Sequence, residues 1–147
     1  MAKKTNVWAR KKSRRALVQA VYQWQVSGNS LASVAKDFAD GEALKKADTE
    51  FFGELLSLVA NQAEELDQHF VDKLDRTVEQ LDQVERAILR LACAELLHRI
   101  DVPYRVVIDE YVELTKTFGA QSSHKYINGV LDGLAGDLRA VEVNAGG

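Results

Sequence analysis

Five cations stand within six residues near the start of the chain, in the segment RKKSRR from Arg10 to Arg15. Like charges this close repel one another, and an anionic partner such as the phosphates of a nucleic acid would relieve that repulsion. Residues 1 to 36 carry eight basic side chains and no acidic one, whereas the remaining residues carry 11 basic and 22 acidic ones. The net charge of −3 therefore conceals a basic head and an acidic body, which suit two different partners.

The basic cluster has two interpretations. In the first it is a solvated tail whose cations only aid solubility. In the second it is part of a helix, because it runs directly into ALVQAVYQWQVSG, a strong helical pattern that predicts a helix from about Arg14 to Val26. Cations in a first helical turn oppose the helix dipole. A protein that keeps them there is expected to use their charge, so we predict a nucleic-acid surface.

Aromatic rings near the cations strengthen this prediction, because single-stranded nucleic acid is often held by bases stacked on rings beside a cationic groove. Tyr22 lies off the apolar stripe of the first helix, toward the side of Arg15, whereas Trp24 lies on that stripe and is expected in the core. A second candidate is the segment QSSHKYIN at 121–128. There a helix start would offer backbone N–H groups, two hydroxyls, Lys125 and Tyr126. Helix capping alone would also explain its serines.

No residue pattern indicates catalysis, a metal or a cofactor. The three histidines, at positions 69, 98 and 124, are far apart, and no Cys or His spacing resembles a zinc site. The glycines of GVLDGLAGD have the wrong spacing for a phosphate loop and lie in a helical pattern. Cys93 stands in the apolar run ILRLACAELL, where a buried, inert thiol is expected. The sequence therefore favours a binding module over an enzyme.

The elements that must position these residues are all predicted to be helices, since the chain has one proline and no β-branched runs flanked by turn pairs. After the first helix, Ser30 caps a short helix over 31–39, and Asp48 caps a long one of about twenty residues. Asp82 and Glu85 form a capping-box pattern before the apolar segment 84–99, the expected central helix. Two further helices are predicted over 103–118 and 124–139.

The fold class predicted is all-α, in a single domain of about six to seven helices over residues 10–140. A basic tail over 1–9, which could lack order, precedes it, and a frayed end over 141–147 follows. No stretch approaches the 18 uninterrupted apolar residues of a membrane helix, and the basic N-terminus lacks the apolar run of a secretory signal. We therefore expect a cytoplasmic protein without membrane contact.

Three separated blocks of the sequence resemble a known family. They are ARKKSRRALVQAVYQWQ, QVERAILRLACAELLHRIDVPYRVVIDEYVELTKTFG and SSHKYINGVLD, and the chain is similar from Ala9 to about Leu138 to the bacterial transcription antitermination factor NusB family. The resemblance implies two three-helix bundles that bind the boxA element of ribosomal RNA leader transcripts as single-stranded RNA. It also implies pairing with the ribosomal protein NusE and joining NusA, NusG and RNA polymerase, with no catalysis.

The resemblance, together with the cluster, implies two surfaces. The RNA surface is expected to comprise Arg10, Lys11, Lys12, Arg14, Arg15, Tyr22, Ser122, Ser123, Lys125 and Tyr126. The NusE surface is expected on acidic ground near the start of the central helix, at Glu85 with Asp82 and Glu79 as neighbours. Family members commonly carry an acid early in the last helix cap, where this chain has Ser122, a change that should favour RNA.

Two other functions stay open at this point. One is a helical protein-interaction module with no role in RNA binding. The other is an RNA-binding domain like the one that precedes the catalytic part of some ribosomal RNA cytosine methyltransferases, although no methyl-donor-binding domain follows in this chain. The sequence also leaves open whether the protein forms a homodimer.

Overall fold

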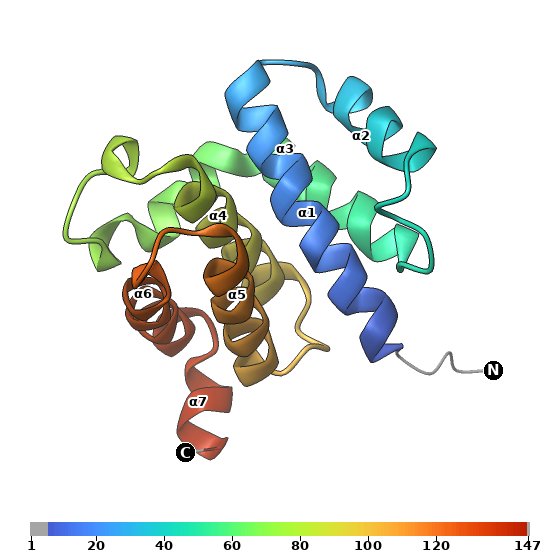
Figure 1. The fold of residues 1–147 in the computed structure, drawn as a ribbon. Coiled ribbons are helices and arrows are strands. Elements are labelled where there is room, and N and C mark those ends of the chain that lie inside the picture. Colours follow the sequence, from blue (N-terminus) through green and yellow to red (C-terminus); the bar gives the residue numbers. More distant parts are fainter. Residues whose placement is uncertain (1–5, 147) are drawn as a thin grey trace.

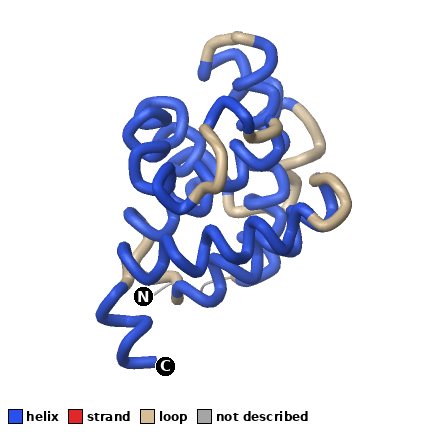
Figure 2. The backbone as a smooth tube through the Cα atoms, turned by 90° about the vertical axis from the view of Figure 1, so that its left-hand side faces the viewer, coloured by secondary structure: helices blue, strands red, loops and turns tan. Residues whose placement is uncertain are grey.

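Helices and connecting loops make up residues 6–146, the part of the chain that the computed structural model describes (Figure 1). Figure 2 shows no strand among these residues, so the all-α prediction is confirmed. The described residues form seven α-helices and two short 3-10 turns: α1 (Val7–Ser27), α2 (Leu31–Asp40), α3 (Thr49–Phe70), η1 (Val71–Lys73), η2 (Val78–Gln80), α4 (Gln83–His98), α5 (Tyr104–Phe118), α6 (Ser123–Leu138) and α7 (Ala140–Gly146).

The predicted caps fix the helix starts. The side chains of Ser30 and Asp48 accept hydrogen bonds from backbone N–H groups in the first turns of α2 and α3. At the start of α4, Asp82 accepts from the Glu85 backbone N–H (2.8 Å) while the Glu85 carboxylate accepts from the Asp82 N–H (3.2 Å), which completes the capping box. Gly28 ends α1 with φ of 73°, the left-handed conformation that favours glycine.

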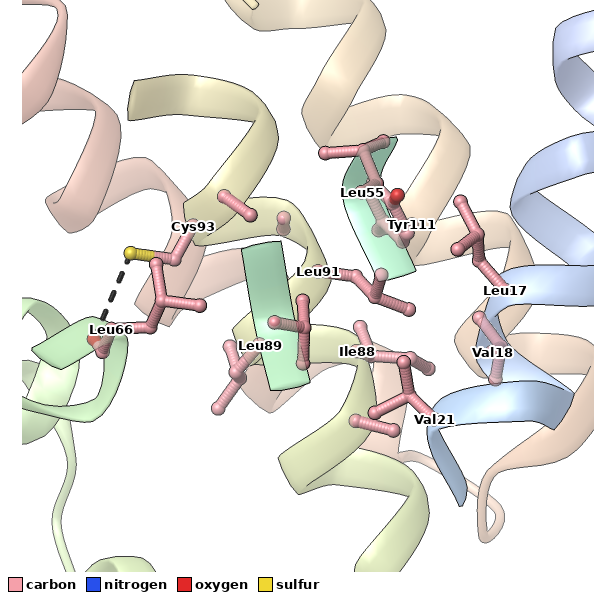
Figure 3. Close-up of a cluster of buried hydrophobic side chains, with 14 of the residues drawn as sticks. Leu17, Val18, Val21, Leu55, Leu66, Ile88, Leu89, Leu91, Cys93 and Tyr111 are labelled. Carbon is pink, nitrogen blue, oxygen red and sulfur yellow. Dashed lines mark hydrogen bonds between the residues drawn. The ribbon is translucent and has the colours of Figure 1, made fainter. Parts of the chain in front are cut away.

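Helices α1 to α3 form one bundle and α4 to α6 the other, as expected, and α4 joins them because it packs against α1, α3, α5 and α6 (Figure 1). Every residue from Ala87 to Leu96 is buried. In the close-up of Figure 3, Val18 and Val21 of α1 face Ile88 of α4 across the core. The central position of α4 explains why its apolar residues extend around more than one face.

Two charged residues of α4 lie in this buried stretch, and each has an opposite charge as its partner. The Arg90 guanidinium donates to both carboxylate oxygens of Asp67 in α3, at 2.8 Å each. Glu95 pairs in the same two-pronged way with Arg14 of α1. A buried charge is tolerated only when it is paired and hydrogen-bonded, so these pairs fix how α4 meets both neighbours.

Helix α1 begins earlier than the sequence predicts, and a helix also covers residues near the C-terminus. Helix α1 begins at Val7, with Asn6 as its cap, so the basic cluster lies in the second and third turns and the start expected near Arg14 is wrong. Residues 1–5 of the predicted tail lie outside the described residues. At the other end α7 continues to Gly146, where fraying was expected, because the Glu142 carboxylate accepts a hydrogen bond from the Tyr104 N–H (2.8 Å) and anchors this helix to α5.

Candidate functional site

The basic cluster divides between the inside and the outside of the protein. Arg14 is only 3% exposed: its Nε and Nη2 donate to Glu95 at 2.8 and 2.9 Å, and its guanidinium lies over the Phe51 ring. Burial alone would lower the pKa of Arg14, but the hydrogen bond and charge of Glu95 raise it above its ordinary value. The prediction that Arg14 contacts RNA is therefore corrected, because its five-donor group is enclosed and already paired.

Arg10 and Lys11 are half-buried and engaged with carboxylates. Arg10 lies 3.6 Å from Asp48 and 3.4 Å from Asp101, and the Lys11 ammonium donates to Glu110 at 2.6 Å. These pairs have an exposed side, where ion pairs contribute little to stability and can exchange partners. Both cations can therefore reach an incoming phosphate, but only by giving up a carboxylate.

Lys12 and Arg15 are the exposed cations of the cluster. Lys12 has no ion pair within residues 6–146, and the guanidinium of Arg15 lies over the Phe118 ring, 5.2 Å from its centroid. A guanidinium held against a ring keeps its charge and its outward donors while losing little freedom on binding an anion. These two side chains are the members of the cluster best placed to neutralise phosphates.

Tyr22 lines a groove of about 580 Å³ together with Phe118, the ring over which the Arg15 guanidinium lies. The groove runs between α1 and the neighbouring helices, with Phe38 of α2 and Val84 of α4 in its walls. Tyr22 itself is 42% exposed. Three aromatic rings, those of Tyr22, Phe38 and Phe118, thus line this groove, and Arg15 lies over the last of them.

At the start of α6, only some of the residues predicted to contact RNA are exposed. Lys125 is exposed, and Ser122 is exposed with φ of 71°, a left-handed conformation uncommon for serine. Ser123 is buried, with its hydroxyl donating to Glu85 at 2.7 Å, so its expected role as an RNA contact is corrected. The ring of Tyr126 is half-buried, and the Arg76 guanidinium covers one of its faces, 4.2 Å from its centroid.

Of the three acids expected to face the protein partner, one is buried and two are exposed. Glu85 is 7% exposed, since it closes the capping box and accepts from Ser123, so a direct contact through Glu85 is corrected to a positioning role. Asp82 and Glu79 are exposed at the entrance to α4. Asp82 stands two residues before Val84, which lines the Tyr22 groove.

Comparison with known proteins gives the family directly. The family model described as the NusB family matches residues 11–136. The chain belongs to the NusB family. It is 50% identical over 136 residues to the transcription antitermination protein NusB of Alcanivorax borkumensis, covering 92% of this chain and 91% of that one. It is 51% identical over 131 residues to the protein of the same name from Pectobacterium carotovorum, covering 89% and 94%.

Solved structures of NusB proteins share this fold. NusB of T. maritima matches with a TM-score of 0.78 at 28% identity, over 90% of this chain and 92% of that one. A structure of the antitermination factors NusB and NusE in complex with double-stranded RNA matches with a TM-score of 0.79 at 26% identity, over 88% and 97%. The two-bundle arrangement found here is therefore that of the NusB family.

Metal ligands, the single thiol and long apolar helices are three further features of the described residues. Among residues 6–146 no group of three His, Cys, Asp or Glu side chains could hold a metal ion. Cys93 is buried, and burial raises the pKa of its thiol to about 12, so it is inert as expected. No described helix is both long and apolar enough to cross a bilayer.

Phe118 and Gln19 are the residues of this surface that the sequence analysis missed. Gln19 was detectable, because it lies four residues after Arg15 and three before Tyr22 and so shares their face of α1. Phe118 lies far away in sequence, at the end of α5, and no local pattern predicts that its ring supports Arg15. Only the packing of α5 against α1 brings it there.

Proposed function

We propose that this protein is a transcription antitermination factor that binds the boxA element of ribosomal RNA leader transcripts as single-stranded RNA, together with NusE. In the cytoplasm the pair would join NusA, NusG and RNA polymerase and suppress termination, with no catalytic step of its own. The names of the relatives and the neighbouring NusB–NusE–RNA structure support this proposal.

One observation carries the RNA part of the proposal: the guanidinium of the exposed Arg15 lies over the ring of Phe118, which also lines the Tyr22 groove. Phosphates would bind Lys12 and Arg15, and a base would stack on the exposed ring of Tyr22. Lys125 and the exposed backbone around Ser122 would extend the surface toward α6. Arg10 and Lys11 would contribute by exchanging their carboxylates for phosphates.

The partner side of the proposal rests on the acidic ground at the start of α4. Asp82 and Glu79 are exposed and carry the charge that a basic ribosomal protein would meet. The hydrogen bond between Ser123 and Glu85 joins the start of α6 to the start of α4. The proposed RNA surface on α6 and the proposed partner surface on α4 are therefore linked by a direct contact. A partner bound there would lengthen the RNA groove, and the pair would hold RNA more tightly than either subunit alone.

A titration of fluorescently labelled boxA RNA tests this function. Fluorescence anisotropy should show weak binding to the protein alone, binding at least about tenfold tighter when NusE is added, and weaker binding to a scrambled RNA of equal length. A protein that captures NusE but ignores boxA RNA at low salt would instead be an interaction module without an RNA role.

A further inference from the structure

We propose that Trp8 is a base-stacking residue that extends the RNA surface to the first turn of α1, an inference that rests on the proposed RNA-binding function. Trp8 is 72% exposed, compared with 42% for Tyr22. Exposing an indole ring to water is unfavourable. Within residues 6–146 the ring has no hydrogen bond, stacking partner or cation over its face.

The position of Trp8 on α1 places it in line with the proposed site. Residues 8, 12, 15, 19 and 22 follow the helical spacing of three and four, so they form one stripe along α1. That stripe reads Trp8, Lys12, Arg15, Gln19 and Tyr22, with an aromatic ring at each end and two cations between them. At the rise of an α-helix the two rings are about 21 Å apart along the axis, which leaves room for more than one nucleotide between them.

Trp8 lines a shallow hollow together with cations of the basic cluster. Its volume is about 330 Å³, and Lys11, Lys12 and Arg15 line it together with Glu110 and Glu113 of α5. Both carboxylates already have cations, since Glu110 pairs with Lys11 and Arg14, and Glu113 with Lys116. Lys12 and Arg15 therefore keep their charge available beside the ring, and Arg15 lies in this hollow and over Phe118 at once.

This arrangement fits single-stranded RNA better than a protein partner. Rings separated by cations along one line match the alternation of bases and phosphates in an unpaired strand. A protein contact at the same place would bury Lys12 and Arg15 against a surface that must supply carboxylates of its own. The structure thus predicts that a strand entering at Tyr22 continues along α1 and places a base on Trp8.

The test measures the affinity for RNA and the fluorescence of Trp8. In anisotropy titrations with boxA RNA, Trp8→Ala should weaken binding by about 5- to 150-fold, the range for loss of one stacked base, while Trp8→Phe should stay within about threefold of wild type. Val141→Ala, an exposed apolar residue on α7, serves as the control and should change nothing. In a Trp24→Phe background, where Trp8 is the remaining tryptophan, RNA should quench the fluorescence.

The outcomes separate this inference from the proposed function. If wild type binds boxA RNA and Trp8→Ala binds it equally well, the inference about Trp8 is wrong and the proposed function stands. If Trp8→Ala changes the molecular mass in light scattering without changing RNA affinity, Trp8 is a contact between protein copies and the inference is again wrong. If wild type binds no RNA, both fail together.

Discussion

Replacing Arg14 by methionine is expected to lower the free energy of unfolding by about 3 to 5 kcal/mol, because the Glu95 carboxylate would stay fully buried without its cation. The loss should appear as a lower midpoint in urea unfolding followed by circular dichroism. The double variant Arg14→Met/Glu95→Leu removes both charges and fills similar volume, so it should recover part of the loss.

An Arg14→Met protein that unfolds at the same urea concentration as wild type would contradict this structural role. The result also matters for function, since a scan of the basic cluster would otherwise count Arg14 among the RNA contacts. In the fraction that remains folded, the salt dependence of RNA binding should be that of wild type. Arg14 is therefore a residue that positions α1 against α4.

Arg139→Ala should lower the free energy of unfolding by about 2 to 4 kcal/mol, through loss of the cap on the central helix. The Arg139 side chain is buried and donates to the carbonyl oxygens of Leu96 (2.7 Å), Arg99 (3.0 Å) and Val102 (3.0 Å). These carbonyls lie at the end of α4 and in the loop after it, where helix geometry leaves acceptors without partners.

Thermal unfolding would measure this effect, with Arg139→Lys as the conservative comparison. Lysine keeps the charge but cannot reach three carbonyls with a planar fork, so its loss should be intermediate. The surface variant Lys45→Ala should stay within about 0.5 kcal/mol of wild type. If Arg139→Ala matched that control, the carbonyls would have found other partners and the capping role would be refuted.

The helices were predictable because their signals are local. Ser30, Asp48 and the Asp82–Glu85 pair each stand directly before an apolar pattern of helical period, and each caps a helix in the structure. The start of α1 was missed because the cluster was interpreted as a first turn, whereas Asn6 caps the helix before it. The dipole argument then does not apply, since that effect fades beyond the first turn.

The division of the cluster also had a signal in the sequence. Arg10 and Arg14 share the face of Leu17 and Val21 at spacings of three and four, so they lie on the apolar stripe, whereas Lys12 and Arg15 do not. A cation on an apolar stripe requires a buried partner, and Glu95 stands within an equally apolar run. What the sequence could not supply is the register of α1 against α4, which decides that these two charges meet.

The positions of Ser123 and Tyr126 were beyond local reasoning for a different reason. Both belong to a segment with hydroxyls and a cation at a helix start, a pattern as typical of capping as of RNA binding. The structure shows that their partners come from residues 38 and 50 positions earlier in the chain, Glu85 and Arg76. Tertiary packing, which local patterns do not contain, therefore decided which half of the segment faces solvent.

The most direct test of the RNA surface is the salt dependence of boxA binding in a charge-matched pair of variants. Four to six neutralised phosphates predict a log–log slope of about −3 to −4 for wild type, and Lys12→Ala/Arg15→Ala should reduce its magnitude by about 1.4 while weakening binding. Lys36→Ala/Lys45→Ala removes the same charge from exposed sites on and after α2. That control should keep the wild-type slope. Equal slopes for both double variants would contradict the account, because the contribution of Lys12 and Arg15 would then be net charge alone.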